Sequence, residues 1–174
     1  MRPLPFLLIP LAAACVPVPA GPAPDARAPV FPVFRFFEGR SSGEATLRVA
    51  FRRRVPVHVE SIGRVEGDTL FLHQVIREGA KPPRERDWRI REVAPGRYAG
   101  SLSDAEGAVM AEASPGRLHL QFTMKGGLAT EQWLTLAPDG RSAHNVLTAR
   151  KLGIVVAALE ETIREACPVQ RFIG

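Results

Sequence analysis

The sequence predicts an all-β protein, an antiparallel up-and-down β-barrel of about eight or nine strands followed by one C-terminal helix. Three observations lead to this fold class. Apolar and polar residues alternate with a period of two over most of residues 44–150. Turn residues interrupt the alternation at short intervals, and no helical segment lies between the strands. Such strands follow one another as a meander, and closure into a barrel removes the edge strands of the meander.

The alternation also identifies individual strands and their buried faces. In the first strand, Leu47, Val49 and Phe51 share a face, and the run Arg52–Arg54 is interpreted as a turn. The apolar faces of the later strands are Val55/Val57/Val59, Leu70/Leu72/Ile76, Leu118/Leu120/Phe122/Met124 and Leu134/Leu136. Gln74 lies on the same face as Leu70 and Leu72, so this polar residue is expected to point inward.

The last segment changes period. One helical face holds Ile154, Val155, Ala158, Leu159, Ile163 and Ala166, and the other holds Glu160, Glu161, Arg164 and Glu165. This pattern predicts an amphipathic helix that packs on the barrel wall or mouth. Binding to a membrane surface is the alternative, and the acidic polar face of the helix disfavours it.

The N-terminal region differs in composition from the rest. Residues 1–14 have the order of a secretory signal peptide: a basic residue, an apolar run and small residues before Cys15. Residues 15–33 are rich in proline and predict an extended tether that lifts the domain off a membrane. The β-barrel domain with its C-terminal helix is then expected to occupy residues 34–174.

The stretch Leu11-Ala12-Ala13-Ala14-Cys15 resembles the lipobox of bacterial lipoproteins. The resemblance implies that Cys15 carries the lipid and that the membrane is a partner through it. In such lipoproteins an aspartate directly after the cysteine marks retention in the inner membrane, and this chain has Val16 at that position. The implied location is therefore the bacterial cell envelope, on the periplasmic face of the outer membrane. A secreted protein with an incidental cysteine is the alternative. Cys167 would then have no intramolecular disulfide partner, and burial beneath the last helix is expected for it.

A second resemblance begins further along the chain. The pieces that carry it are Phe36-Phe37-Glu38-Gly39, Arg86-Asp87-Trp88, and Tyr98-Ala99-Gly100 with Asp104 and Gly107. In order and spacing they are similar to an uncharacterised family of bacterial lipoproteins, a domain of unknown function. The resemblance implies a calycin or lipocalin-like barrel. Gln74 departs from it, because the family tends to carry a glutamate there.

Composition and motifs limit the chemistry. The net charge of +5 comes with 20 Arg and 3 Lys spread along the chain, and a general preference for Arg codons explains it better than phosphate binding. The sequence has no aromatic-interleaved basic stripe, so no nucleic-acid partner is expected. The four histidines lack metal-ligand spacing, and no catalytic or cofactor motif is present. We therefore expect no metal, no cofactor and no enzymatic activity.

The parity of one strand predicts a site. Trp88 and Ile90 should point inward, so Arg86 should do so too, and a buried guanidinium needs a partner such as Asp104. The hypothesis is that a small polar cluster in an apolar cavity binds the headgroup of a ligand. The cluster would consist of Arg86, Trp88, Gln74, Tyr98 and Asp104. The structural interpretation, which we favour at this stage, is that Arg86 packs over Trp88 and closes one barrel end through a salt bridge.

Three functions follow from these interpretations. The leading hypothesis is a membrane-anchored envelope lipoprotein that binds a small apolar ligand, such as a lipid or fatty acyl chain. The second is a packed barrel that binds another envelope protein through Trp133 or the last helix. The third is an enzyme, or an accessory of one, that acts on lipid. It would require a carboxylate or a histidine inside the cavity.

Overall fold

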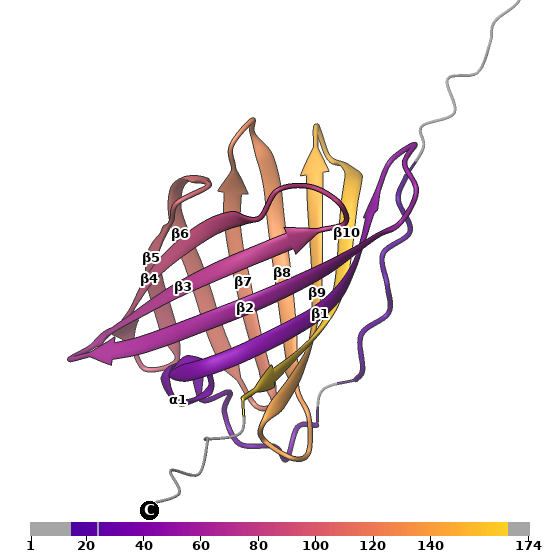
Figure 1. The fold of residues 1–174 in the computed structure, drawn as a ribbon. Coiled ribbons are helices and arrows are strands. Elements are labelled where there is room, and N and C mark those ends of the chain that lie inside the picture. The colour runs from indigo at the N-terminus through magenta and orange to yellow at the C-terminus, as the bar shows by residue number, and fades with distance from the viewer. Residues whose placement is uncertain (1–14, 24, 167–174) are drawn as a thin grey trace, which may run out of the picture.

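The structure is a computed structural model that describes residues 15–23 and 25–166. Ten antiparallel strands form one closed barrel in which each strand pairs with its neighbours in sequence and β1 pairs with β10 (Figure 1). The strands are β1 (Gly39–Val49), β2 (Val55–Glu66), β3 (Thr69–Glu78), β4 (Arg84–Ala94), β5 (Arg97–Leu102), β6 (Ala105–Ser114), β7 (Arg117–Met124), β8 (Leu128–Leu136), β9 (Ser142–Lys151) and β10 (Ile154–Glu165). The predicted all-β antiparallel barrel is confirmed, with ten strands in place of eight or nine.

The predicted C-terminal helix is wrong. Residues 154–165 form β10, which pairs with β9 on one side and with β1 on the other. A β-bulge between Val155 and Ala157 shifts the register near the start of this strand. The bulge and the many Ala, Leu and Glu residues imitate a helical period in the sequence. Without the pairing between them, β1 and β10 would be edge strands with unpaired backbone groups. Pairing satisfies these groups, and closure of the barrel therefore overrides local helix propensity.

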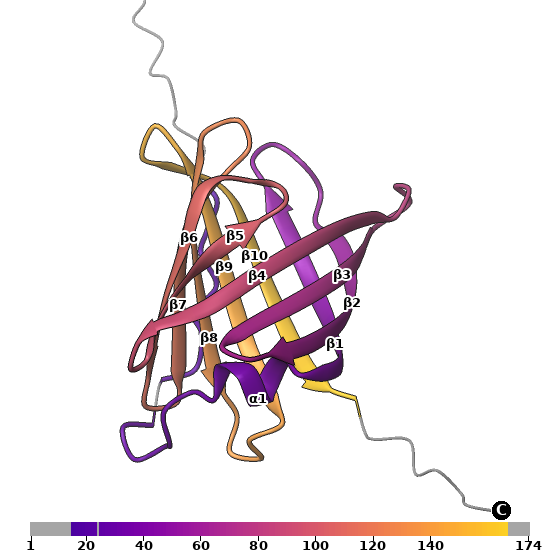
Figure 2. The same ribbon diagram turned by 90° about the vertical axis from the view of Figure 1, so that its left-hand side faces the viewer.

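The only helix among the described residues is α1 (Val33–Phe37), which lies across one end of the barrel (Figure 2). Phe31 and Phe36 are each only 1% exposed, and their rings meet edge to face with centroids 5.1 Å apart. Gly63 on β2 lets the end of α1 approach, because a Cβ there would lie 1.7 Å from the carbonyl oxygen of Phe37. The core of the domain thus begins at Phe31, slightly before the predicted boundary at residue 34.

The proline-rich segment is not a free tether in the part that the structure describes. It runs along the outside of the barrel from one end to the other (Figure 1). The amide of Val16 donates a hydrogen bond to the carbonyl oxygen of Val155, and Val16 packs on Val155 and Ala158. At the other end, Val30 forms a β-bridge with Pro115. The prolines favour an extended segment, and the contacts of Val16 and Val30 hold its two ends against the barrel.

Two further expectations concern Phe51 and the two ends of the chain. Phe51 does not continue the inward face of β1, because the strand ends at Val49 and Phe51 lies in the following turn with a φ of 60°. The predicted signal peptide, residues 1–14, and Cys167 lie outside the described residues. Within residues 15–23 and 25–166, no helix combines the length and the apolar composition needed to cross a membrane.

Candidate functional site

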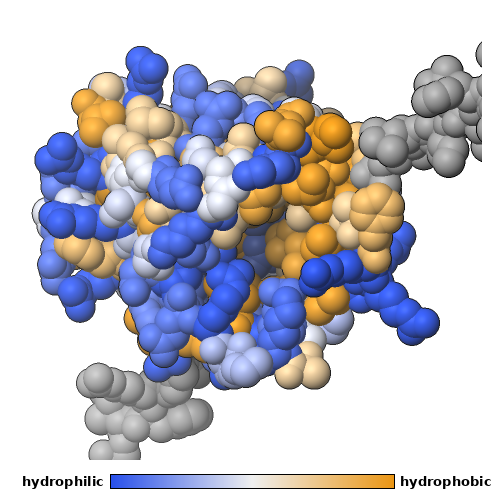
Figure 3. All heavy atoms as spheres, turned by 90° about the horizontal axis from the view of Figure 1, so that it is seen from above, coloured by the Kyte–Doolittle hydropathy of each residue, from blue (hydrophilic) through white to orange (hydrophobic). Residues whose placement is uncertain are grey.

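The barrel encloses a cavity of about 270 Å³. Most of its lining is apolar and comes from every strand except β5, with Val33 and Phe37 of α1 at one end. Towards the opposite end, the lining reaches Val49, Glu78, Arg84 and Met124, which lie next to the turns between strands. Figure 3 looks onto this second end, which we call the mouth, and shows that it is hollowed. The cavity is near the lower limit of small-molecule sites in size.

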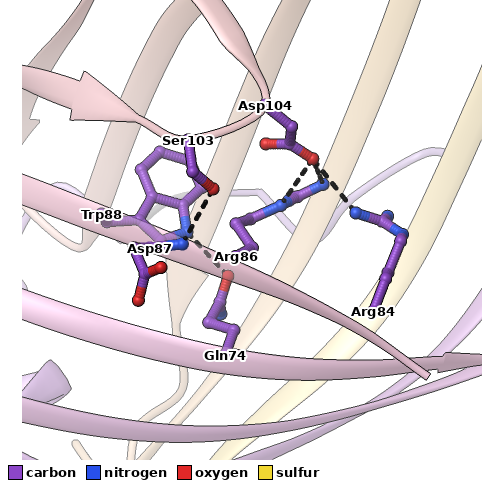
Figure 4. A network of polar contacts seen from close by, with 7 residues as sticks. All are labelled: Gln74, Arg84, Arg86, Asp87, Trp88, Ser103 and Asp104. Carbon is purple, nitrogen blue, oxygen red and sulfur yellow. Dashed lines mark hydrogen bonds and ion pairs between the residues drawn. The ribbon is translucent and has the colours of Figure 1, made fainter.

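Arg86 lies inside the barrel on β4, as its parity with Trp88 predicts. Its Nε and Nη2 atoms lie 3.1 and 2.9 Å from Oδ2 of Asp104, which stands in the β5–β6 turn (Figure 4). Arg84 reaches the same oxygen at 3.1 Å. Burial lowers the pKa of Arg86, and the negative charge of Asp104 acts in the opposite direction. The ion pair therefore holds a cation inside the mouth of the cavity.

Trp88 and Gln74 lie beside this ion pair. The indole Nε1 of Trp88 donates a hydrogen bond of 2.7 Å to Oε1 of Gln74, whose Nε2 donates to the hydroxyl of Ser61 at 3.1 Å. Gln74 and Arg86 are direct partners in the β3–β4 register, so their side chains leave the same face at the same height. The ring of Trp88 packs edge to face on Phe122, with centroids 5.6 Å apart. These contacts fix the orientation of both polar side chains in the cavity wall.

A second polar pair faces the cavity from β9 and β10. The Nδ2 atom of Asn145 donates a 2.7 Å hydrogen bond to Oε2 of Glu161. Both residues are buried, at 1% and 8% exposure. Burial raises the pKa of Glu161, against the hydrogen bond from Asn145 and the positive charge of Arg86. This pair was not predicted from the sequence, because Glu161 falls on the polar face of the predicted helix. Period-two counting from Ala157 through Leu159 would have placed the carboxyl inside.

Gly43 makes room for this carboxyl group. A Cβ built at Gly43 on β1 would lie 1.9 Å from Oε1 of Glu161. Gly43 stands opposite Ile163, one inward position away from Glu161. The Oδ1 atom of Asn145 has no hydrogen-bond partner in the structure, although it is buried. A buried acceptor without a partner is costly, so the pair has unused capacity to bind a donor inside the cavity.

Tyr98 does not belong to this cluster. It is buried on β5, where its ring packs edge to face on Phe34 of α1 with centroids 5.7 Å apart. Burial and the nearby Glu92 raise the pKa of its hydroxyl. The structure thus brings together Gln74, Arg86, Trp88 and Asp104 of the predicted set and places Tyr98 at the α1 end. Tyr98 lies near the start of β5, whereas Asp104 follows the end of this strand, so the two residues are separated along the barrel axis.

Trp133 and the last helix were the two surfaces expected to bind a protein partner, and neither has the expected structure. The predicted helix is absent, and Trp133 is covered on the outer wall. The ring of His119 stacks on Trp133 at 3.7 Å, and the guanidinium of Arg117 lies 4.5 Å from the ring centroid. His119 also contacts Glu131 at 2.9 Å. Among the described residues, no three His, Cys, Asp or Glu side chains lie together as a metal site would require.

Comparisons with known proteins give the fold. No family model matches the chain, and no curated protein matches its sequence. Among solved structures, the chain is similar to the S-type phycobiliprotein lyase CPES from Guillardia theta, with a TM-score of 0.59, 9% identity, and coverage of 78% of this chain and 92% of the lyase. Rv2717c from M. tuberculosis matches with a TM-score of 0.58, 14% identity, and coverage of 75% and 93%.

A third similar structure is a protein of unknown function of the DUF3598 family from Nostoc punctiforme. Its TM-score is 0.55 at 10% identity, over 81% of this chain and 51% of that longer protein. Identities this low establish the fold and not the activity. The comparisons therefore support the lipocalin-like barrel implied by the second resemblance, and they do not extend to lipoprotein status.

The expectation that the chain is not an enzyme needs correction. A barrel of the same fold belongs to a phycobiliprotein lyase, so this architecture can carry catalysis. The expectation rested on the absence of motifs, and a site assembled across strands leaves no motif. Glu161 also places a carboxyl group inside the cavity, which an enzyme acting on lipid would require. What the structure and the comparisons establish together is a lipocalin-like barrel with an internal, mostly apolar cavity.

Proposed function

We propose that this barrel binds one small amphipathic ligand, an apolar chain with a single polar end such as a fatty acid, inside its cavity. The observation that carries the proposal is the cavity of about 270 Å³, which is apolar for most of its surface and open at the mouth. An apolar chain inside this cavity would be removed from water and would contact the apolar side chains of the lining.

The few polar groups in the wall indicate how the ligand would be oriented. Arg86 uses Nε and Nη2 for Asp104, which leaves Nη1 for the ligand. Across the cavity, Oδ1 of Asn145 has no hydrogen-bond partner. Glu161 adds a carboxyl group there, and burial raises its pKa, which favours the protonated form. A carboxylic acid can accept a bond from Arg86, and a hydroxyl or amide can donate one to Asn145. The polar end of the ligand is therefore expected between β4 and β9.

The test is titration with a fluorescent fatty acid, 11-(dansylamino)undecanoic acid, after extraction of lipid from the purified full chain. Ala149 lines the cavity, so Ala149→Phe fills part of it and should weaken probe binding by about tenfold or more. Ala129 is exposed on the neighbouring strand, and Ala129→Phe should leave binding unchanged. Equal affinity in all three proteins would contradict the proposal, as would an absence of binding to the parent protein.

A milder variant protects this test against misfolding. Ala157→Leu adds less volume at another lining position and should weaken binding in the same direction. Circular dichroism identifies any variant that fails to fold. If Ala157→Leu folds and binds the probe as the parent does, the ligand does not occupy the cavity.

We also propose that Cys15 carries a lipid that anchors the protein in a bacterial envelope. Two observations support this second proposal. Residues 11–15 resemble a lipobox, and Cys15 is exposed, as a residue that carries a lipid must be. Labelling of cells with radioactive palmitate should mark the protein, and Cys15→Ala should abolish the label. Label that survives this substitution would refute lipidation at Cys15.

A further inference from the structure

The mouth of the barrel carries two exposed apolar side chains at the tips of adjacent hairpins. Phe51 in the β1–β2 turn is 90% exposed, and Leu152 in the β9–β10 turn is 94% exposed. Because β1 pairs with β10, the two hairpins are neighbours (Figure 1). Figure 3 shows apolar side chains gathered on one side of the hollow. Single exposed apolar residues are ordinary, but two at the tips of adjacent turns form a protruding apolar edge.

The backbone at both tips has an unusual conformation. Phe51 has a φ of 60° and Leu152 a φ of 50°, and they are the only described residues other than glycine with positive φ. This conformation is unfavourable for large side chains and is normally given to glycine or asparagine. A large apolar side chain in this conformation, in contact with water, stabilises nothing within the barrel. Its presence at both tips favours a role outside the barrel.

The charges at the mouth differ from those at the other end. The five turns around the mouth, residues 50–54, 79–83, 103–104, 125–127 and 152–153, carry five basic residues and one acidic residue. The acidic residue is Asp104, which is already paired with Arg84 and Arg86. The four turns at the α1 end carry one basic residue against two acidic ones. The basic residues Arg52, Arg53 and Arg54 directly follow Phe51 and are all exposed.

From this arrangement we infer that the mouth of the barrel docks on an anionic lipid bilayer. Phe51 and Leu152 enter the boundary between headgroups and acyl chains, while Arg52–Arg54 and Lys125 contact the phosphates. Apolar tips surrounded by basic side chains are the combination that binds a protein to the surface of an anionic membrane. The docked barrel presents its cavity to the acyl chains, so an apolar ligand could pass between them with little exposure to water.

The position of Cys15 agrees with this orientation but does not carry the inference. The amide of Val16 donates a hydrogen bond to Val155, which lies close to the Leu152 tip in the sequence. Ile154, between the tip and Val155, is 42% exposed. The described chain therefore starts at the mouth (Figure 1). Docking through the tips requires no acyl chain on Cys15 and no bound ligand. The two proposals above can therefore fail without affecting this inference, and the reverse also holds.

The test uses the full chain with Cys15→Ser, which removes the acylation site, and vesicles of 70% phosphatidylcholine and 30% phosphatidylglycerol. Tryptophan is introduced as Phe51→Trp, as Leu152→Trp and, for the control, as Ile62→Trp on the outer wall, where Ile62 is 49% exposed. Brominated acyl chains should quench the added fluorescence at positions 51 and 152 and leave that at position 62 unchanged. Quenching at position 62 equal to that at the tips would overturn the inference.

A loss-of-binding experiment gives a second measurement. Phe51→Ser with Leu152→Ser should weaken sedimentation with these vesicles by about tenfold or more, since each residue loses its apolar contact with lipid. The matched control, Ile62→Ser with Val93→Ser, removes two half-exposed wall residues and should have no effect. Pure phosphatidylcholine vesicles should bind the parent more weakly. If the tip variant binds as the parent does, or if vesicles of both compositions bind equally, the mouth is not an anionic-membrane surface.

Discussion

At the scale of single residues, the interior of the barrel depends on charged groups that are buried in pairs. Arg86 has 11% of its side chain exposed, and Asp104 in the turn has 24%. Glu161 relies on one hydrogen bond from Asn145 and on the space above Gly43. Such groups are expensive to leave without a partner and nearly neutral when they are paired. Their presence in an otherwise apolar wall supports the proposal that this wall contacts the polar end of a ligand.

The first residue-scale prediction concerns Asp104. Asp104→Asn keeps the shape of the side chain but removes the charge that faces Arg86 and Arg84, and it should lower the free energy of unfolding by about 1–3 kcal/mol. Denaturation in urea measures the change. The control is Asp87→Asn on the outer face of β4, where the carboxylate contacts His73 and is largely exposed, so little change is expected. If both variants lose the same stability, the buried pair has no special role.

The second prediction concerns pH. The pKa of Glu161 is raised in the folded protein, so above the ordinary value of 4.5 the unfolded chain loses this proton first. The contribution of Glu161 to stability therefore declines as pH rises from there towards neutrality. Glu161→Gln can still accept the bond from Asn145, and its stability relative to the parent should increase over this range. Unfolding curves measured from pH 4 to 7 test it, with Glu85→Gln on the exposed wall as control. A difference that is constant with pH would contradict the burial of an ionisable group.

At the scale of elements, alternation was sufficient to predict the strands that have one apolar face. Leu118, Leu120 and Phe122 on β7 leave no other interpretation. The same signal failed in β10, where Ala157, Leu159 and Glu161 face the cavity while Ala158 on the outer face is buried by Val16. Val16 covers the outer face near the start of this strand, so the period of two is hidden there. Contacts made by a distant segment cannot be seen in local sequence.

The pairing of β10 gives the element-scale prediction. Leu47 and Leu159 are direct partners across β1 and β10. In a chain with Cys15 and Cys167 replaced by Ser, Leu47→Cys with Leu159→Cys should form an intramolecular disulfide on mild oxidation, detected as a shift on a non-reducing gel. Leu47→Cys with Ile163→Cys, four residues out of register, should not. A disulfide in the second pair alone would show that the register is different.

At the scale of the whole molecule, the two ends of the barrel differ in structure. Phe31 and Phe36 close one end with apolar packing, and the mouth carries Phe51, Leu152 and the basic turns. The sequence could predict the closed barrel and the inward direction of Arg86, because both follow from parity. It could not predict which end is closed, or that Tyr98 and Arg86 are separated along the barrel axis. These properties depend on strand register and on α1, which few local residues determine.

The most direct test of ligand binding is a crystal structure of the protein soaked with 12-bromododecanoic acid. We predict anomalous density for bromine inside the barrel, with the carboxyl group near Arg86 or Asn145. Density at the outer wall only, or no bromine signal inside the barrel at saturating ligand, would contradict the claim that this barrel holds an apolar chain.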